Sequence, residues 1–229
     1  MKPPRSARTT ADPQRPSRPI DPAKVAAKAA QEVRLIGGRW KRTPLAVPVV
    51  AGLRPTPSRV RETLFNWLGQ DMGGWRVLDA FAGSGALGFE AASRGAESVC
   101  LVEREAVLVK SLRATQAKLA ATQVQIVQAD ALAWMGRLSG RAPGFDLVLL
   151  DPPFSDDLFE AALRAAVHCV PEHGWIYLES PEAFSDASSA TDAVPGLRLH
   201  RKGSAGAVHY HLFQRVEGAP GVSRQAAGD

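Results

Sequence analysis

The sequence has little cysteine and no long hydrophobic run. Only two of its 229 residues are cysteines, Cys100 and Cys169, and they form no C-x-x-C pair, which argues against a disulfide framework or a cysteine zinc site. Apolar runs such as Leu147 to Leu150 are far shorter than the roughly 20 residues of a transmembrane helix. The basic N-terminus is not followed by an apolar stretch, which argues against a secretory signal peptide. We therefore expect a cytoplasmic protein with reduced thiols and no membrane association.

The composition is that of an ordinary globular chain, but its charge is unevenly distributed. Hydrophobic residues make up 45% and charged residues 22%, which excludes a wholly disordered, collagenous or coiled-coil protein. Residues 1–61 contain 14 Lys and Arg against 3 Asp and Glu, whereas the remainder contains 14 against 20. A basic arm on an acidic body is typical of a polyanion binder, and nucleic acid is the leading partner. The alternative is a basic tail that serves only solubility.

The chain divides into four segments by composition. Residues 1–31 are rich in Pro, Arg, Ala and Ser, and they predict a disordered basic arm. Residues 32–70 predict two short basic strands around the turn Gly37-Gly38, then a helix with Thr56 as N-cap, Pro57 at its first position and Gly69 just past its end. Residues 71–216 predict the main domain and residues 217–229 a flexible tail.

Short apolar runs alternate with helical patterns through the main domain. This alternation, with strands that are almost continuous in Val, Leu and Ile, indicates an α/β fold with a doubly wound, mostly parallel sheet. The predicted strands are 76–81, 98–103, 124–130, 146–151 and 175–179, and the predicted helices lie near 86–94, 105–121 and 157–169. Residues 197–202 and 208–215 flank a Gly-containing turn and predict an antiparallel hairpin at the sheet edge.

The first predicted strand of the main domain leads into a glycine-rich turn. Gly83, Gly85 and Gly88 satisfy the pattern G-x-G-x-x-G, and Glu103 ends the next strand. Such a turn lets the backbone approach a nucleotide-like cofactor, whose ribose hydroxyls a carboxylate at that place can accept. The pattern by itself fits NAD equally well. Asp79 favours another cofactor, because a carboxylate there would repel a pyrophosphate but suits the ammonium group of a methionine moiety.

Two further carboxylates follow predicted strands. Asp130 ends the third strand, where it could accept a hydrogen bond from an adenine amine or simply cap a helix. The fourth strand ends in Asp151-Pro152-Pro153-Phe154, and the prolines keep the backbone extended. The Asp151 carboxylate and the Pro152 carbonyl can then accept from one amine, which positions its lone pair for attack on a sulfonium methyl, while Phe154 offers a face for stacking the base.

Together these motifs resemble class I S-adenosylmethionine-dependent methyltransferases that modify exocyclic amines. The stretches 34–41, 52–68, 79–88 and 151–154 are similar to those of the bacterial family that methylates guanine N2 in small-subunit (16S) ribosomal RNA, and the resemblance covers roughly residues 33–215. It implies a Rossmann-like fold with a seven-stranded sheet, an antiparallel C-terminal hairpin and a small basic N-terminal extension. It also implies S-adenosylmethionine as the cofactor, with ribosomal RNA or a partly assembled 30S particle as the partner of a monomeric enzyme.

The resemblance also implies roles for individual residues. Catalysis would fall to Asp151, Pro152, Pro153 and Phe154. The cofactor would be bound by Thr56, Arg59, Asp79, Phe81, Ala82, Gly83, Ser84, Gly85, Glu103, Asp130 and Ala131. RNA would be bound by Arg39, Trp40, Lys41 and Arg42, with Lys202 and Tyr210 from the final hairpin. For Trp40 the alternative is a local core residue.

Three other functions also fit parts of the sequence. A DNA adenine-N6 or cytosine-N4 methyltransferase uses the same tetrapeptide, but 229 residues leave little room for a DNA target-recognition domain. An NAD-dependent oxidoreductase would need an acid or base near the nicotinamide, and the chain offers no obvious candidate. A non-catalytic RNA-binding protein would not need the intact tetrapeptide.

His209 and His211 alternate onto one face of a predicted strand, which we interpret as solvent-facing, and we expect no metal site.

Overall fold

The computed structural model describes residues 32–48, 56–139, 141, 144–154, 157–184 and 194–217. The predicted basic arm, the Arg54-Pro55 segment and most of the predicted tail therefore lie outside the described residues. In the described part of the chain, no helix has the length and apolar character needed to cross a membrane.

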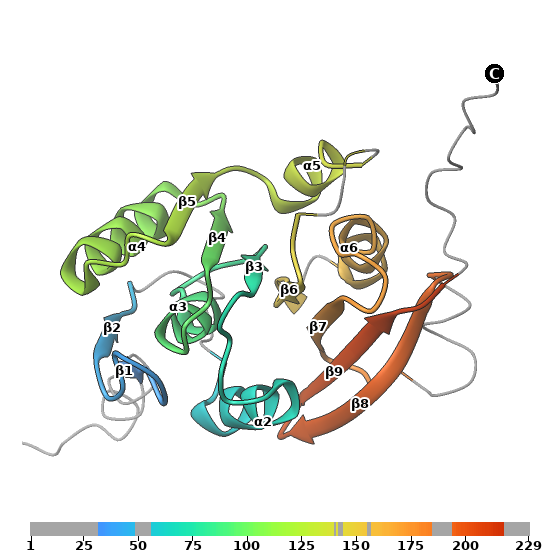
Figure 1. The fold of residues 1–229 in the computed structure, drawn as a ribbon, viewed down its shortest axis with the longest axis horizontal. Helices are drawn as coiled ribbons and strands as arrows, with labels where there is room; N and C mark the ends of the chain where they lie inside the picture. Colours follow the sequence, from blue (N-terminus) through green and yellow to red (C-terminus); the bar gives the residue numbers. More distant parts are fainter. Residues whose placement is uncertain are drawn as a thin grey trace, which may run out of the picture.

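A seven-stranded sheet forms the centre of the molecule, in the order β5-β4-β3-β6-β7-β9-β8 (Figure 1). The strands are β3 (Arg76–Asp79), β4 (Ser98–Glu103), β5 (Val124–Gln128), β6 (Leu147–Leu150), β7 (Trp175–Ser180), β8 (Leu197–Ala205) and β9 (Val208–Arg215). Neighbours from β5 to β7 pair in parallel, whereas β9 is antiparallel to both β7 and β8. The predicted fold class and the antiparallel C-terminal hairpin are thus confirmed.

Helices cover both faces of this sheet, as the almost continuous apolar strands require. One face packs against α2 (Ser58–Leu68), α3 (Ala86–Ser93) and α4 (Ala106–Leu119), and the other against α5 (Ala131–Gly136) and α6 (Phe159–Ala166). Alternate residues of one strand serve opposite faces: Leu147 and Leu149 join the first core, Val148 and Leu150 the second. The sheet therefore separates two hydrophobic cores, one on each of its faces.

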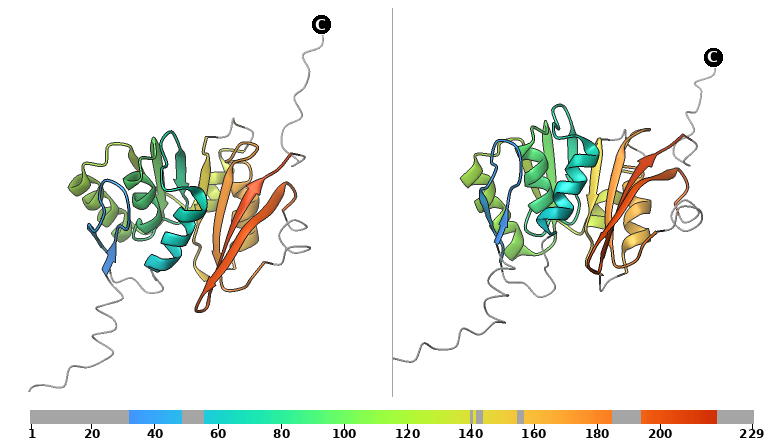
Figure 2. Two further views of the ribbon diagram at one scale, coloured as in Figure 1. Left: turned by 60° about the horizontal axis from the view of Figure 1, so that its bottom comes forward. Right: turned by 90° about the horizontal axis from the view of Figure 1, so that it is seen from below.

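A separate two-stranded hairpin, β1 (Glu32–Arg34) and β2 (Pro44–Ala46), stands beside α3 and α4, away from the β8–β9 hairpin (Figures 1 and 2). The two short strands are confirmed, and the turn between them includes Gly37 and Gly38. Gly38 has φ +69°, and a Cβ there would overlap the Ser93 carbonyl. Glycine is needed at this position because the backbone turns in the left-handed region against α3.

Some element boundaries differ from the sequence-based ones. β3 ends at Asp79 and not at Phe81, although the amides of Ala80 and Ala82 still donate to the carbonyl oxygens of Leu149 and Val102 in the neighbouring strands. α5 was not predicted; its six residues are too few to show a helical period. Thr56 is not the N-cap of α2: Pro57 holds that position, without a side-chain cap. The Thr56 hydroxyl donates instead to Asp151, a tertiary contact that sequence spacing does not reveal.

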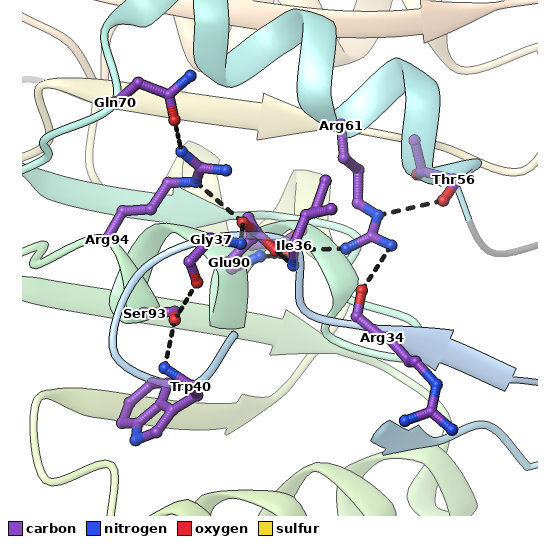
Figure 3. Close-up of polar contacts among 12 residues, drawn as sticks. Arg34, Ile36, Gly37, Trp40, Thr56, Arg61, Gln70, Glu90, Ser93 and Arg94 are labelled. Carbon is purple, nitrogen blue, oxygen red and sulfur yellow. Dashed lines mark hydrogen bonds and ion pairs between the residues drawn. The ribbon is translucent and has the colours of Figure 1, made fainter. Parts of the chain in front are cut away.

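A buried ionic network fastens the hairpin to the rest of the molecule (Figure 3). The Glu90 carboxylate of α3 is fully buried and accepts hydrogen bonds from the backbone N–H groups of Ile36 and Gly37, both at 2.8 Å. Arg61 of α2 and Arg94 also donate to it, at 3.4 and 2.9 Å. A buried charge is tolerated only when it is paired and hydrogen-bonded, so Glu90 requires all three segments to be in place.

Arg61 extends this network toward the carboxyl edge of the sheet. Its remaining guanidinium groups donate to the backbone carbonyl oxygens of Arg34 and Thr56, at 2.9 and 3.3 Å (Figure 3). Burial lowers the pKa of Arg61, and the charge of Glu90 opposes that shift. Arg61 therefore positions the start of α2 and the Thr56 residue. Arg61 is itself held by its ion pair with Glu90 of α3.

Glu90→Ala should lower the free energy of unfolding by about 3–5 kcal/mol, because two guanidinium groups and two backbone N–H groups lose a buried acceptor. Urea-induced unfolding monitored by circular dichroism measures this change. Glu160→Ala is the matched control, since Glu160 pairs with Arg164 while both side chains are more than half exposed; its cost should stay below about 1 kcal/mol. Equal costs for the two variants would contradict the importance of the network.

Candidate active site

Four acidic side chains gather at the carboxyl edge of the sheet. Asp79 ends β3, Glu103 ends β4, Asp151 follows β6, and Glu179 lies near the end of β7. β3 and β6 are neighbours, although β4 and β5 separate them in the chain, so strand order reverses between them. In open α/β sheets ligands bind outside the carboxyl ends of the strands at this switch point. The fold thus brings the predicted glycine turn and the predicted tetrapeptide to the same edge of the sheet.

The glycine turn connects β3 to α3 in a conformation that only small residues permit. Gly85 caps α3 with φ +78°, and a Cβ there would lie 2.5 Å from the Phe89 ring. The Gly83 N–H donates to a Glu103 carboxylate oxygen at 2.8 Å. The other oxygen of Glu103 accepts from the Glu105 N–H at 2.9 Å. Glu103 therefore ties the turn to the end of β4, where a ribose would be read in this architecture.

Asp79 lies beneath the turn and is only 1% exposed. One carboxylate oxygen, Oδ2, accepts from the Gly88 N–H at 2.9 Å. The other, Oδ1, is buried without a hydrogen-bond partner among the described residues. Burial raises the pKa of Asp79 to about 7, and the negative charges of Asp151 and Glu103 add to the shift. An unsatisfied buried carboxylate is matched by a cationic group, so the site fits the ammonium of a methionine moiety.

Asp130 and Ala131 lie at the end of β5. Asp130 is exposed, and its side chain accepts from the Ala133 N–H at 2.8 Å, which makes it the N-cap of α5. The helix-cap alternative for Asp130 is therefore realised, while a contact with an adenine is left as an expectation. Ala131 is buried in the core beside α6.

The Asp151 tetrapeptide is anchored at one end and open at the other. The Thr56 hydroxyl donates to Asp151 Oδ2 at 3.2 Å, and Pro152 is buried. Burial raises the pKa of Asp151 to about 7, with the Thr56 hydrogen bond acting in the opposite direction. Pro153 and Phe154 are exposed, and the Phe154 ring, 41% accessible, has an edge contact with Phe159. The ring is thus available to an incoming base.

Glu179 and Tyr177 were not among the residues predicted from sequence. Glu179 is 2% exposed and accepts from the Tyr177 hydroxyl at 3.0 Å. Burial raises the pKa of Glu179 well above its ordinary value, and the nearby charge of Asp151 adds to this. A signal did exist: Glu179 is an acidic residue near the end of an apolar strand, as Asp79 and Glu103 are.

The residues predicted to bind RNA fall into two groups. Arg39, Lys41 and Arg42 are exposed at the tip of the β1–β2 hairpin. Their loop is fixed to the last residue of α3, because the Arg39 N–H donates to the Ser93 carbonyl oxygen at 2.7 Å. α3 runs back from the carboxyl edge, so this tip lies about 12 Å along the helix axis from the glycine turn. The structure does not bring the tip to the carboxyl edge of the sheet.

Two aromatic residues predicted to meet RNA are buried. Trp40 is 8% exposed within the first core, and its backbone N–H donates to the Ser93 hydroxyl. Stacking of a base on Trp40 therefore does not fit this structure, and the core alternative does, because the hairpin needs an apolar anchor against α3. Tyr210 is 7% exposed and packs against Trp67. Lys202 is exposed; it pairs with His211, which pairs with Leu178, so its side chain lies on the face of the sheet opposite to Glu179.

The interpretation of His211 as solvent-facing is wrong. Its side chain is fully buried, accepts from the Phe184 N–H at 3.0 Å, and packs against the Phe184 and Phe213 rings. The segment after β7 folds over this strand face, which a period-two pattern cannot show. Burial lowers the pKa of His211 to about 4.

Within the described ranges, no group of three or more His, Cys, Asp and Glu side chains is arranged to hold a metal ion.

Comparisons with known proteins agree with this geometry. A family model described as conserved hypothetical protein 95 matches residues 33–214. The sequence is 37% identical over 191 residues to the Ribosomal RNA small subunit methyltransferase D of Escherichia coli, covering 80% of this chain and 90% of that protein. The protein of the same name from Haemophilus influenzae is 35% identical over 192 residues, covering 81% and 95%. The solved structure of a putative methyltransferase from Escherichia coli superposes with a TM-score of 0.68 at 34% identity, covering 81% and 98%.

Asp79→Asn should stabilise the protein without added ligand, and the gain should grow as pH rises. The raised pKa means that the folded state keeps its proton longer than the unfolded state, so this group's contribution to stability falls between about pH 3.8 and about pH 7. Thermal unfolding across that range measures the effect. Asp146→Asn is the control of opposite sign: although burial raises the pKa of Asp146, Arg76 lowers it overall. That variant should be destabilised at neutral pH, with a loss that shrinks in acid.

Proposed function

The chain belongs to the family described as conserved hypothetical protein 95, and we propose that it is a ribosomal RNA methyltransferase that transfers the methyl group of S-adenosylmethionine to the exocyclic N2 of a guanine in small-subunit (16S) ribosomal RNA. The observation that carries the proposal is the meeting of Asp151-Pro152-Pro153-Phe154 with the buried Asp79 at the switch point of the sheet. The names of the relatives, which are small-subunit ribosomal RNA methyltransferases, support the substrate class.

The cofactor would lie along the carboxyl ends of β3, β4 and β5. Asp79 would hold its ammonium group, Glu103 its ribose, and Asp130 with Ala131 its adenine, while Phe81, Ala82, Gly83, Ser84 and Gly85 would form the turn around it. Thr56 and Arg59, at the start of α2, would cover it. When bound, S-adenosylmethionine supplies a methyl group on a positively charged sulfur. A site with several carboxylates and few cations favours such a ligand electrostatically.

The tetrapeptide would prepare the guanine amine for transfer. This amine is conjugated to the ring and is a poor nucleophile, so acceptors aimed at its hydrogens favour a pyramidal nitrogen. The Asp151 carboxylate and the Pro152 carbonyl oxygen would serve as these acceptors, and Asp151 can take the proton that the amine loses. The exposed Phe154 ring would stack on the base. No observation favours the DNA adenine-N6 or cytosine-N4 alternative.

Contacts with RNA beyond the target base would come from the β8–β9 hairpin and from the β1–β2 tip. Lys202 lines a hollow of about 200 Å³ with Ala183, Gly203, Ser204, His209 and His211, next to the end of β7. Arg39, Lys41 and Arg42 would meet phosphates farther from the crevice. We propose that the enzyme acts as a cytoplasmic monomer on naked RNA or on a partly assembled 30S particle.

The decisive assay is transfer of a radiolabelled methyl group from S-adenosylmethionine to small ribosomal subunits from cells that lack this protein. Nucleoside analysis of the product should place the label in N2-methylguanosine. Label in another nucleoside would refute the guanine N2 assignment, and label that is lost on DNase but not RNase treatment would favour the DNA alternative.

Asp151→Ala should reduce kcat by about 10²- to 10³-fold, the usual cost of removing one acceptor or donor from a preorganised site. Its affinity for S-adenosylmethionine, measured by isothermal titration calorimetry, should stay within about threefold of the wild-type value because the cofactor rests on other strands. Asp79→Ala is the converse variant and should lose cofactor affinity first. Equal loss of affinity and turnover in Asp151→Ala would contradict the catalytic role.

Lys202→Ala should raise KM for the RNA substrate by a few-fold with little change in kcat, because a phosphate contact contributes affinity and not chemistry. The slope of log KM against log salt should fall by about one. Arg164→Ala provides the comparison, since Arg164 is an exposed arginine on α6 that pairs with Glu160. An identical response of the two variants would remove Lys202 from the RNA-binding surface.

A further inference from the structure

Glu179 is a buried acid for which the proposed reaction so far has no use. It lies beside Asp151: Leu150 of β6 pairs with Leu178 of β7, so the next residues of the two parallel strands stand level. Leu149 and Tyr177 both belong to the core beneath α2. Because strand side chains alternate, Asp151 and Glu179 point to that same face. The sheet register thus places two carboxyl groups next to each other under the start of α2.

The Thr56 hydroxyl connects these two carboxyl groups. It donates to Asp151 Oδ2 at 3.2 Å, and its hydrogen bonding with the Glu179 side chain lowers the pKa of Glu179. On the other side, the Tyr177 hydroxyl donates to Glu179 Oε1 at 3.0 Å. A continuous row therefore runs from Tyr177 through Glu179 and Thr56 to Asp151. Three of these residues are fully or almost fully buried, and Asp151 is partly accessible at the crevice.

We propose that Glu179 is a positioning residue for methyl transfer, acting as a neutral carboxylic acid that accepts from Tyr177, donates to Thr56 and so holds the Asp151 carboxylate for the substrate amine. This inference rests on the proposed function. In this row every hydrogen bond is donated in the same direction, from Tyr177 toward Asp151. Such chains polarise one another, and each member restricts the orientation of the next. With Oδ2 occupied by Thr56, Oδ1 is the oxygen that serves the amine.

The surroundings of Glu179 support its neutral form. Asp79 faces it from β3 and Asp151 from the end of β6, and both are acidic. Tyr177 and Tyr210 supply hydroxyl groups from β7 and β9. Arg61 approaches from α2, but its ion pair is with Glu90. Neighbouring buried carboxyl groups cannot both ionise at neutral pH. Burial raises the pKa of Glu179 and that of Asp151, and the hydrogen bonds of Thr56 and Tyr177 oppose the shift of Glu179. Glu179 is 2% exposed whereas Asp151 is partly accessible, so the more deeply buried Glu179 keeps the shared proton.

Three substitutions of Glu179 separate this role from a charged one. Glu179→Gln keeps a donor and an acceptor in the same shape without a titrating proton, so kcat should stay within about threefold of wild type at neutral pH. Glu179→Asp keeps the acid but shortens the side chain, and Glu179→Ala removes it. Both should lower kcat by about 10- to 100-fold, the order of loss for a misplaced reacting group. The Kd for S-adenosylmethionine and the KM for RNA should change little.

The pH profile provides a readout that a merely structural role would not change. In the wild type, ionisation of Glu179 in alkali removes its donor to Thr56, whereas a glutamine keeps it. The ratio of kcat for Glu179→Gln to kcat for wild type should therefore rise with pH above neutrality. A Glu179→Gln variant as slow as Glu179→Ala, or a Glu179→Ala variant as fast as wild type, would overturn the proposal.

A second pair of variants keeps the test informative if Glu179→Ala fails to fold. Thr56→Val removes the middle hydroxyl at nearly constant shape, and Thr56→Ser restores it. Thr56→Val should lower kcat about as much as Glu179→Ala, and Thr56→Ser should recover it. Because both residues act through one row, Thr56→Val combined with Glu179→Gln should be no slower than Thr56→Val alone. Independent, multiplying losses would refute the connection.

An infrared measurement separates this proposal from the proposed function. The difference spectrum of wild type minus Glu179→Gln at mildly alkaline pH should contain the C=O stretch of a protonated carboxyl group. If that band is present while the wild type methylates no small subunits, the proposed reaction is wrong and the neutral acid stands. If the wild type is active and the band is absent, Glu179 is ionised and the positioning role proposed for it is wrong.

Discussion

The arrangement of the β1–β2 hairpin, α2 and α3 depends on one buried carboxylate, Glu90. Two backbone N–H groups of the hairpin and two guanidinium groups, from α2 and from the end of α3, converge on it. An ionised group without water is stable only with such partners, so the hairpin, α2 and α3 are held in one arrangement. Because Arg61 also donates to the Thr56 carbonyl oxygen, the constraint reaches the crevice, where Thr56 contacts Asp151.

The crevice itself combines desolvation with negative charge. Asp79, Asp151 and Glu179 are each buried enough that their pKa values rise, and the charge of Asp151 adds to the shifts of Asp79 and Glu179. Such a site is costly without a ligand, and a cationic ligand relieves the cost. The same low dielectric strengthens every hydrogen bond made to the reacting amine. Rigid support from Glu90 on one side and buried, unsatisfied carboxylates on the other are therefore complementary parts of the proposed methyltransferase site.

Much of the fold followed from sequence patterns. The almost continuous apolar strands required a parallel sheet covered on both faces, and the Gly turn, Asp79 and Glu103 appeared at the strand ends where the structure has them. The sequence pattern does not predict the short helix α5, because six residues show no helical period. It predicts Thr56 as a helix cap, because local spacing cannot show a contact across 95 residues. The strand pattern predicts a solvent-facing His211 and leaves Trp40 open between RNA binding and the core, whereas neighbouring segments cover both. Local patterns carry no information about which distant segment packs against them.

The α/β class, the glycine-rich turn and the tetrapeptide of the proposed amine methylation can be predicted from the amino-acid sequence, because each depends on residue types at short spacing. The folded chain adds that β3 and β6 are neighbours, that Glu179 and Tyr177 join Thr56 and Asp151, and that the basic hairpin tip lies away from the carboxyl edge of the sheet. Strand order and register are set by the packing of two whole cores, so these contacts have no signature within any single stretch of chain.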